Sequence, residues 1–187
     1  MTFLAELWMP IVLSAVLVFV ASSLIHMVIM WHKSDYHQFS NEDGVRAAIR
    51  AANASPGLYV IPHAKDMKEF GTEEMKKKFV EGPVGFVTLK APGPPAMGGA
   101  LAQWFVFSLG VAVIAAYLTA HTLFHGASFL GVCRVVGTVV FLAYGAGSVT
   151  QGIWMGKPWH SVAMELLDAA IYALINALVF AWLWPHG

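Results

Sequence analysis

Polar side chains recur along the last long apolar segment of the chain. Ser161, Glu165, Asp168, Tyr172 and Asn176 follow one another at steps of three and four residues. This spacing places them on one face of a helix. A carboxylate inside a membrane is costly unless it faces protein, water or a partner, so Glu165 and Asp168 mark a candidate functional site.

Side chains from the other apolar segments are expected to meet this row. At a rise of about 1.5 Å per residue, the side chains near one membrane face lie within roughly 10 Å of it. We call this set the inner cluster, and it comprises His26, Gln103, Ser148, Glu165, Asp168 and, further along the row, Tyr172.

The inner cluster has three interpretations. It is a hydrogen-bonded polar core that fixes helix register, a path for protons or a small solute, or a metal site. The metal interpretation uses His26, Glu165 and Asp168, because carboxylates and histidine bind metals inside helical bundles. The chain lacks the two E-x-x-H pairs typical of di-metal bundles. The sequence leaves all three open.

Polar residues at the opposite membrane face form a second predicted set, the outer cluster. Glu6 is the carboxylate available there to neutralise Arg134, so we expect these two to pair. Histidines at helix ends are common, although three of them offer a weaker metal alternative. His26 is predicted near one membrane face and His121 near the other, so the two side chains cannot both bind one haem iron. The members of the outer cluster are Glu6, His121, His125, Arg134 and His186.

The composition requires a membrane. Of 187 residues, 58% are hydrophobic and 12% are charged, which is too apolar for a soluble domain of this size. Four segments are long enough to cross a bilayer, which takes about 20 residues. They are residues 7–31, 98–124, 128–150 and 161–184. We predict an all-α four-helix membrane bundle with three regions: helix 1 in 1–31, a polar segment in 32–97 and three helices in 98–187.

Basic residues give the orientation. Ten of the eleven Lys and Arg residues lie in 32–97 or in the turn near Lys157, and Arg134 is the exception. By the positive-inside rule this side is cytoplasmic and both termini are periplasmic.

The polar segment is expected to have mixed structure. Asn41 or Ser40 is positioned to cap a helix in 42–54, and Thr72 to cap a second in 72–79. Residues 84–90 read as a strand, for which 58–61 is the available partner. The sequence therefore predicts a small helical and extended unit between the first two spans.

Several chemistries lack their sequence signatures. Cys133 is the single cysteine, so there is no internal disulfide, CxxC metal site or haem-attachment motif. The formal net charge is zero, which gives no indication of nucleic-acid binding. We assign no catalytic residue, and the sequence requires no cofactor.

Three short stretches carry a resemblance. The stretches are residues 81–85 (EGPVG), residues 97–105, which begin with MG and end with QWF, and residues 153–159 (IWMGKPW). They are similar to a family of four-span bacterial inner-membrane proteins without an assigned function. The resemblance implies a multi-pass fold and a bacterial inner membrane.

The sequence thus favours a non-catalytic component that acts through the bilayer and other membrane subunits, or through a second copy. The alternative is a small oligomeric transporter or proton-conducting protein using Glu165, Asp168 and His26. A helix-bundle metal-binding enzyme ranks third.

Overall fold

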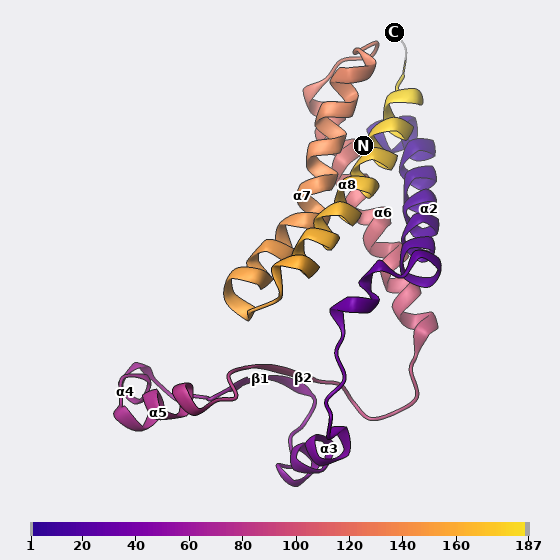
Figure 1. The fold of residues 1–187 in the computed structure, drawn as a ribbon. Coiled ribbons are helices and arrows are strands. Elements are labelled where there is room, and N and C mark those ends of the chain that lie inside the picture. Colours follow the sequence, from indigo (N-terminus) through magenta and orange to yellow (C-terminus); the bar gives the residue numbers. More distant parts are fainter. Residues whose placement is uncertain (1, 186–187) are drawn as a thin grey trace. The chain divides into compact units, whose positions relative to one another are not determined.

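The computed structural model describes residues 2–185 and divides the chain into two compact units (Figure 1). One unit combines residues 1–36 with 96–187, and we call it the helical unit. The other is residues 37–95, which we call the polar unit. Each is described by itself.

The helical unit contains four helices long and apolar enough to cross a membrane. They confirm four helices of the predicted length and apolar composition, and the third extends five residues further than the sequence indicated. A short helix, α1 (Thr2–Glu6), precedes them. The four long helices are α2 (Trp8–Leu24) with its π-helical continuation η1 (Ile25–Ile29), α6 (Met97–Thr122), α7 (Phe129–Met155) and α8 (Trp159–Trp182).

These helices share one apolar core. Helix α7 packs on α8, α2 packs on both α6 and α8, and α6 also contacts α7 (Figure 1). The core is built from side chains at helical spacing, which brings one stripe of each helix inward. Its fully buried members include Val18, Ala112, Ala115, Val132, Val136, Val140 and Phe180.

Three glycines of α7, Gly137, Gly145 and Gly152, lie against α8. A Cβ atom at Gly145 would lie 3.0 Å from Leu166 and 3.2 Å from Ala169, and one at Gly137 would lie 3.7 Å from Ala177. Gly147 has open space instead. The small residues of α7 therefore permit close approach of α8 at particular positions, as expected for packing within a membrane.

The connection from α7 to α8 is short. Gly156 ends α7 in the left-handed conformation (φ 68°), which glycine adopts without a steric cost. Pro158 then precedes the first residue of α8. The two helices consequently form an antiparallel hairpin.

A tight turn follows α2 and packs on α8. Met30 has a left-handed backbone (φ 53°) that ends the π-helical turn η1. The 3₁₀ helix η2 (Trp31–Asp35) comes next and contacts α8. The sequence prediction ended the first span at Trp31 and placed residues 32–35 in the polar segment, whereas contacts group all of η2 with the helical unit. This turn brings His32 and Asp35 to the side of α8.

The polar unit is small and mixed. Asn41 accepts a hydrogen bond from the Gly44 amide, and Thr72 accepts one from Met75, so both predicted caps are confirmed. The antiparallel strands run in register from Gly57 opposite Leu89 to Ile61 opposite Gly85. The unit contains α3 (Glu42–Ala51), β1 (Gly57–Ile61), α4 (Met67–Phe70), α5 (Glu73–Glu81) and β2 (Gly85–Leu89). The sequence indicated all of these except α4.

Candidate functional site

Most of the inner cluster lines one pocket of about 310 Å³ in the helical unit. Five of the six predicted residues contribute to its wall: His26, Ser148, Glu165, Asp168 and Tyr172. Gln103 does not, and its neighbour Trp104 takes that place. We call this the inner pocket.

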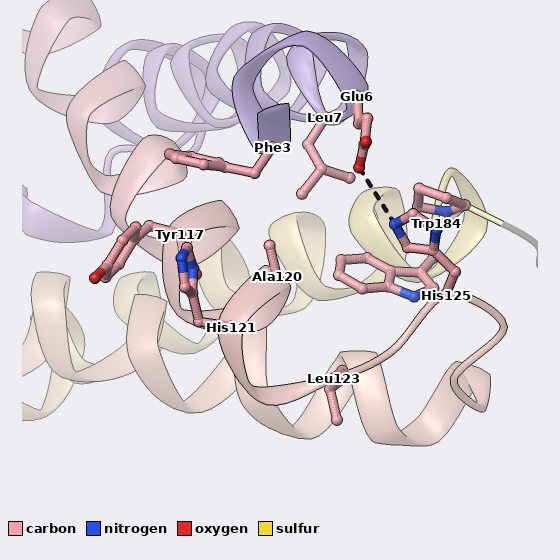
Figure 2. Close-up of a pocket in the computed structure, with 10 residues that line it drawn as sticks. Phe3, Glu6, Leu7, Tyr117, Ala120, His121, Leu123, His125 and Trp184 are labelled. Carbon is pink, nitrogen blue, oxygen red and sulfur yellow. Dashed lines mark hydrogen bonds and ion pairs between the residues drawn. The ribbon is translucent and has the colours of Figure 1, made fainter. Parts of the chain in front are cut away.

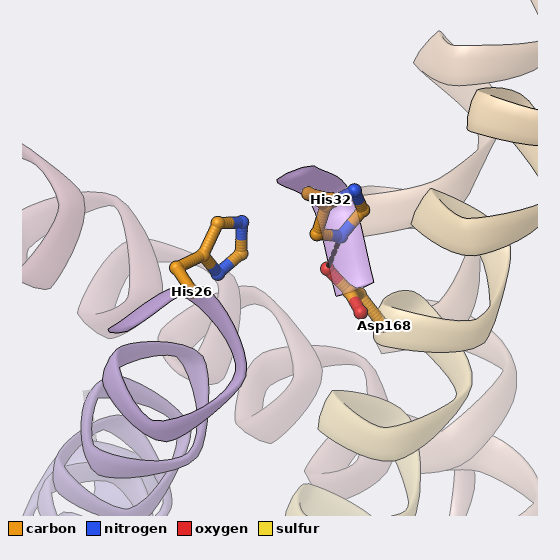
Figure 3. Close-up of side chains that lie close together, drawn as sticks. All are labelled: His26, His32 and Asp168. Carbon is orange, nitrogen blue, oxygen red and sulfur yellow. Dashed lines mark hydrogen bonds and ion pairs between the residues drawn. The ribbon is translucent and has the colours of Figure 1, made fainter. Parts of the chain in front are cut away.

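The centre of the site is a histidine held between two aspartates. In His32, Nδ1 lies 2.7 Å from Asp35 Oδ2, and Nε2 lies 2.8 Å from Asp168 Oδ2. All three side chains are largely shielded from solvent. Figure 3 shows the contact between His32, which comes from η2, and Asp168, which comes from α8. The contact links residues 136 positions apart in the chain.

This arrangement favours the charged form of His32. An ionised carboxylate only accepts hydrogen bonds, so both ring nitrogens must donate, which makes the ring an imidazolium. Burial opposes that charge, but the hydrogen bonds to Asp35 and Asp168 and their negative charges outweigh it and raise the pKa of His32. The hydrogen bond from His32 lowers the pKa of Asp35 despite its partial burial, and the Ser161 hydroxyl adds to the effect.

Each aspartate has a further donor on its second oxygen. Trp31 Nε1 donates to Asp168 Oδ1 at 3.1 Å, and Ser161 Oγ donates to Asp35 Oδ1 at 2.8 Å. Carboxylates that accept several hydrogen bonds are fixed in orientation, so His32 meets two positioned oxygens.

His26 lies beside this group. Its ring stacks on that of His32, with centroids 4.9 Å apart and planes 16° apart. His26 Nδ1 donates to the backbone carbonyl of Ser22 at 2.9 Å, so Nε2 is the nitrogen that carries the lone pair in the neutral ring. One ring nitrogen from each histidine and one oxygen of Asp168 all lie within 4.8 Å of one another. Figure 3 shows the three side chains approaching from η1, η2 and α8.

Glu165 has a different partner. Its carboxylate pairs with Lys157, which also donates to the Gln151 side chain at 3.3 Å. The metal group foreseen from the sequence contained His26, Glu165 and Asp168, whereas the structure groups His32 with His26 and Asp168 instead.

Aromatic rings form another part of the wall of the inner pocket. Trp104, Tyr144 and Tyr172 lie with ring centroids 5.1 to 6.1 Å apart, and Trp104 Nε1 donates to Ser22 Oγ at 2.8 Å. Within the described residues, the hydroxyls of both tyrosines are buried without a hydrogen-bond partner that meets the geometric criterion. The wall of the inner pocket therefore contains two buried hydroxyl groups.

The outer cluster differs from its prediction. Glu6 pairs with His125 at 3.2 Å, so the expected Glu6–Arg134 pair is wrong. Arg134 is exposed and forms no ion pair within residues 2–185. His186 lies outside the described residues. His121 and His125 line a separate pocket of about 470 Å³ with Glu6 (Figure 2), and His121 Nδ1 donates to the Tyr117 carbonyl.

Sequence reasoning missed Trp31, His32 and Asp35. The available signal was the pattern W-H-x-x-D directly after the first span, which places a histidine and a carboxylate three residues apart. Their contacts with Asp168 and Ser161 of α8 depend on the packing of η2 against that helix.

No protein family, characterised protein or solved structure matches this chain in the three comparisons made. The four apolar helices are compatible with an integral membrane protein, and further functional conclusions rest on the geometry.

Proposed function

We propose that the chain is a four-helix-bundle protein of the bacterial inner membrane and a non-catalytic component of a membrane complex. In this proposal both termini are periplasmic, and the polar unit is cytoplasmic and binds a partner protein. The distribution of Lys and Arg supports the orientation. Reporter fusions after Lys78 and after Pro185 test it, with cytoplasmic and periplasmic signals expected respectively.

The observation that carries the proposal is the lack of a core in the polar unit. Within residues 37–95, all of which the structure describes, Met75 is the only buried side chain. A unit of this size normally needs a larger core or a partner to be stable.

The two strands present an apolar face. Directly paired residues in an antiparallel sheet point to the same side. Val60 pairs with Phe86 and Leu58 with Thr88, so these side chains share one face. Leu58 and Phe86 are 61% and 43% exposed. We call Leu58, Val60 and Phe86 the exposed sheet face. Apolar faces of this kind, with unpaired strand edges beside them, are typical of protein-binding surfaces.

The charges favour a protein over lipid headgroups as the occupant. The polar unit has eight basic and seven acidic side chains, so its attraction to an anionic surface is weak. The run of lysines is neutralised locally, because Lys76, Lys77 and Lys78 pair with Glu73, Glu81 and Glu74.

Hydrogen exchange of the full chain in three settings tests the proposal. We expect the amides of β1 and β2 to be protected in native membranes and to exchange fast both in detergent and in vesicles of purified protein and bacterial lipid. Protection in lipid vesicles would show that lipid covers the face. Protection already in detergent would show that the chain covers it itself. Either result overturns the partner proposal.

A matched pair of variants locates the contact. Leu58→Lys should remove the protection seen in native membranes, since it places a charge on the exposed sheet face. Met67→Lys adds the same charge at another exposed apolar position, on α4, and should preserve the protection.

A second candidate function is supported by the inner pocket, where His26, Glu165 and Asp168 meet. These groups suit proton transfer at one membrane face. If the protein conducts protons, Asp168→Asn should abolish proton flux into vesicles of the purified protein while the fold persists. Equal flux in wild type, Asp168→Asn and Glu165→Gln would remove this candidate.

A further inference from the structure

We propose that His26, His32 and Asp168 bind a divalent transition-metal ion of the zinc class, at the wall of the inner pocket. Two imidazoles and one carboxylate form a ligand set that zinc and related metals use when further positions remain open to water or substrate. The proposal is independent of the partner-binding surface on the polar unit.

The spacing of the three groups is close to that of a ligand set. Ligand atoms about 2.0–2.2 Å from one ion lie roughly 3.0–3.5 Å from each other. Here His32 Nε2 and Asp168 Oδ2 are 2.8 Å apart, and all three groups contribute an atom within 4.8 Å of the others. A shift of about 1–2 Å by the exposed His26 side chain closes the set.

Each of the three side chains already forms a hydrogen bond through the atom that would not bind the metal, as metal ligands commonly do. Metal-binding histidines usually donate their second ring nitrogen to a carboxylate or a backbone carbonyl. His32 Nδ1 faces Asp35, and His26 Nδ1 donates to the Ser22 carbonyl. Trp31 holds Oδ1 of Asp168, which leaves Oδ2 for the ion.

The charge balance also favours a cation. The carboxylates of Asp35 and Asp168 both contact the His32 ring and together carry a charge of −2. A divalent ion bound beside a neutral His32 would balance that charge. In a site shielded from water this neutrality is favourable.

A bound ion would have two structural consequences. It would join η1, η2 and α8 through one centre, in addition to the hydrogen bonds and the ring stacking already described. Because His26 and Asp168 also line the inner pocket, a small ligand in the pocket could reach the ion.

Zinc titration of the chelator-treated full-length protein in lipid nanodiscs tests the proposal. We expect one Zn²⁺ per chain by calorimetry, and with Co²⁺ the visible absorption bands of a site with nitrogen and oxygen ligands. Mg²⁺ should not compete, because it takes oxygen ligands and retains its water.

His26→Ala is the decisive variant, because His26 is exposed and bonds only to its own helix, so its loss leaves the fold intact. We expect at least a tenfold loss of Zn²⁺ affinity. Asp35→Asn, which alters the outer hydrogen bond of His32, should lose about 10–100-fold.

His121→Ala provides the matched control. His121 is likewise exposed and likewise donates Nδ1 to the carbonyl four residues earlier, but it lies at the other pocket. Its loss should leave the affinity unchanged. The absence of saturable Zn²⁺ binding, or equal affinities in His26→Ala, His121→Ala and wild type, would overturn the proposal and leave His32 as the cation of a structural ion pair.

Discussion

Two of the histidine–carboxylate pairs in the helical unit have the same chemistry and very different surroundings. In the pair His32–Asp168 the side chains are 12% and 8% exposed, and in His125–Glu6 they are 57% and 45% exposed. The first pair has further partners in Asp35 and Trp31. Water screens the second pair, whereas the first depends on protein groups alone. Burial, rather than residue type, therefore distinguishes the structural centre from a surface contact.

The largest expected difference comes from deleting one partner of the buried pair. His32→Ala leaves two carboxylates facing each other without a cation, so the free energy of unfolding should fall by about 3–5 kcal/mol. Unfolding of the purified protein by guanidinium in mild detergent, with a chelator present to exclude metal stabilisation, measures it. His125→Ala is the control. Equal losses in the two variants would contradict the comparison.

A smaller effect is expected from the tryptophan that positions Asp168. Trp31→Phe retains an aromatic ring but removes the Nε1–H donor to the carboxylate. A hydrogen bond to a charged group contributes about 1.5–3 kcal/mol, and the free energy of unfolding should decrease by that amount. Trp154→Phe, at an exposed position, should have little effect. An unaltered stability in Trp31→Phe would show that Asp168 is already satisfied by His32.

Coupling between partners sharpens the comparison. A double-mutant cycle of His32→Ala and Asp168→Ala should give an interaction energy of about 0.5–3 kcal/mol, because the two side chains share one contact. The corresponding cycle for His125→Ala and Glu6→Ala should give a value near zero. Similar coupling in both cycles would mean that burial does not separate them.

The smallest effect is expected at the exposed pair. Glu6→Gln removes the charge while retaining the shape, and the free energy of unfolding should change by about 0–1 kcal/mol. Raising the salt concentration should remove even that difference, since exposed charges are screened. A larger loss would indicate that the Glu6 pocket is shielded in the membrane.

Local patterns predicted much of the fold. Apolar segments of sufficient length gave the four spans, because hydropathy and length alone determine whether a helix suits a bilayer. Asn41 and Thr72 marked the beginnings of α3 and α5, because capping involves neighbours three residues apart. The short helix α4 was missed, since its four residues are too few for a periodic signal.

The candidate site was predicted only in part. The polar row on α8 identified Glu165, Asp168 and Tyr172, because residues three or four positions apart lie on the same face of a helix. The ion-pair partners of Glu165 and of Glu6 were not predicted. Glu165 pairs with Lys157, and Glu6 pairs with His125 rather than Arg134, because depth along a helix does not specify its rotation toward a neighbour.

The sequence by itself determined which segments are apolar, where their helices begin and that carboxylates lie among them, because these properties depend on neighbours within a few residues. The tertiary structure decided that the turn after the first span folds back on α8 and places His32 between Asp35 and Asp168. That contact joins residues 136 positions apart. It depends on how the helices pack and on the left-handed backbone at Met30 that redirects the chain, and no local periodicity encodes either.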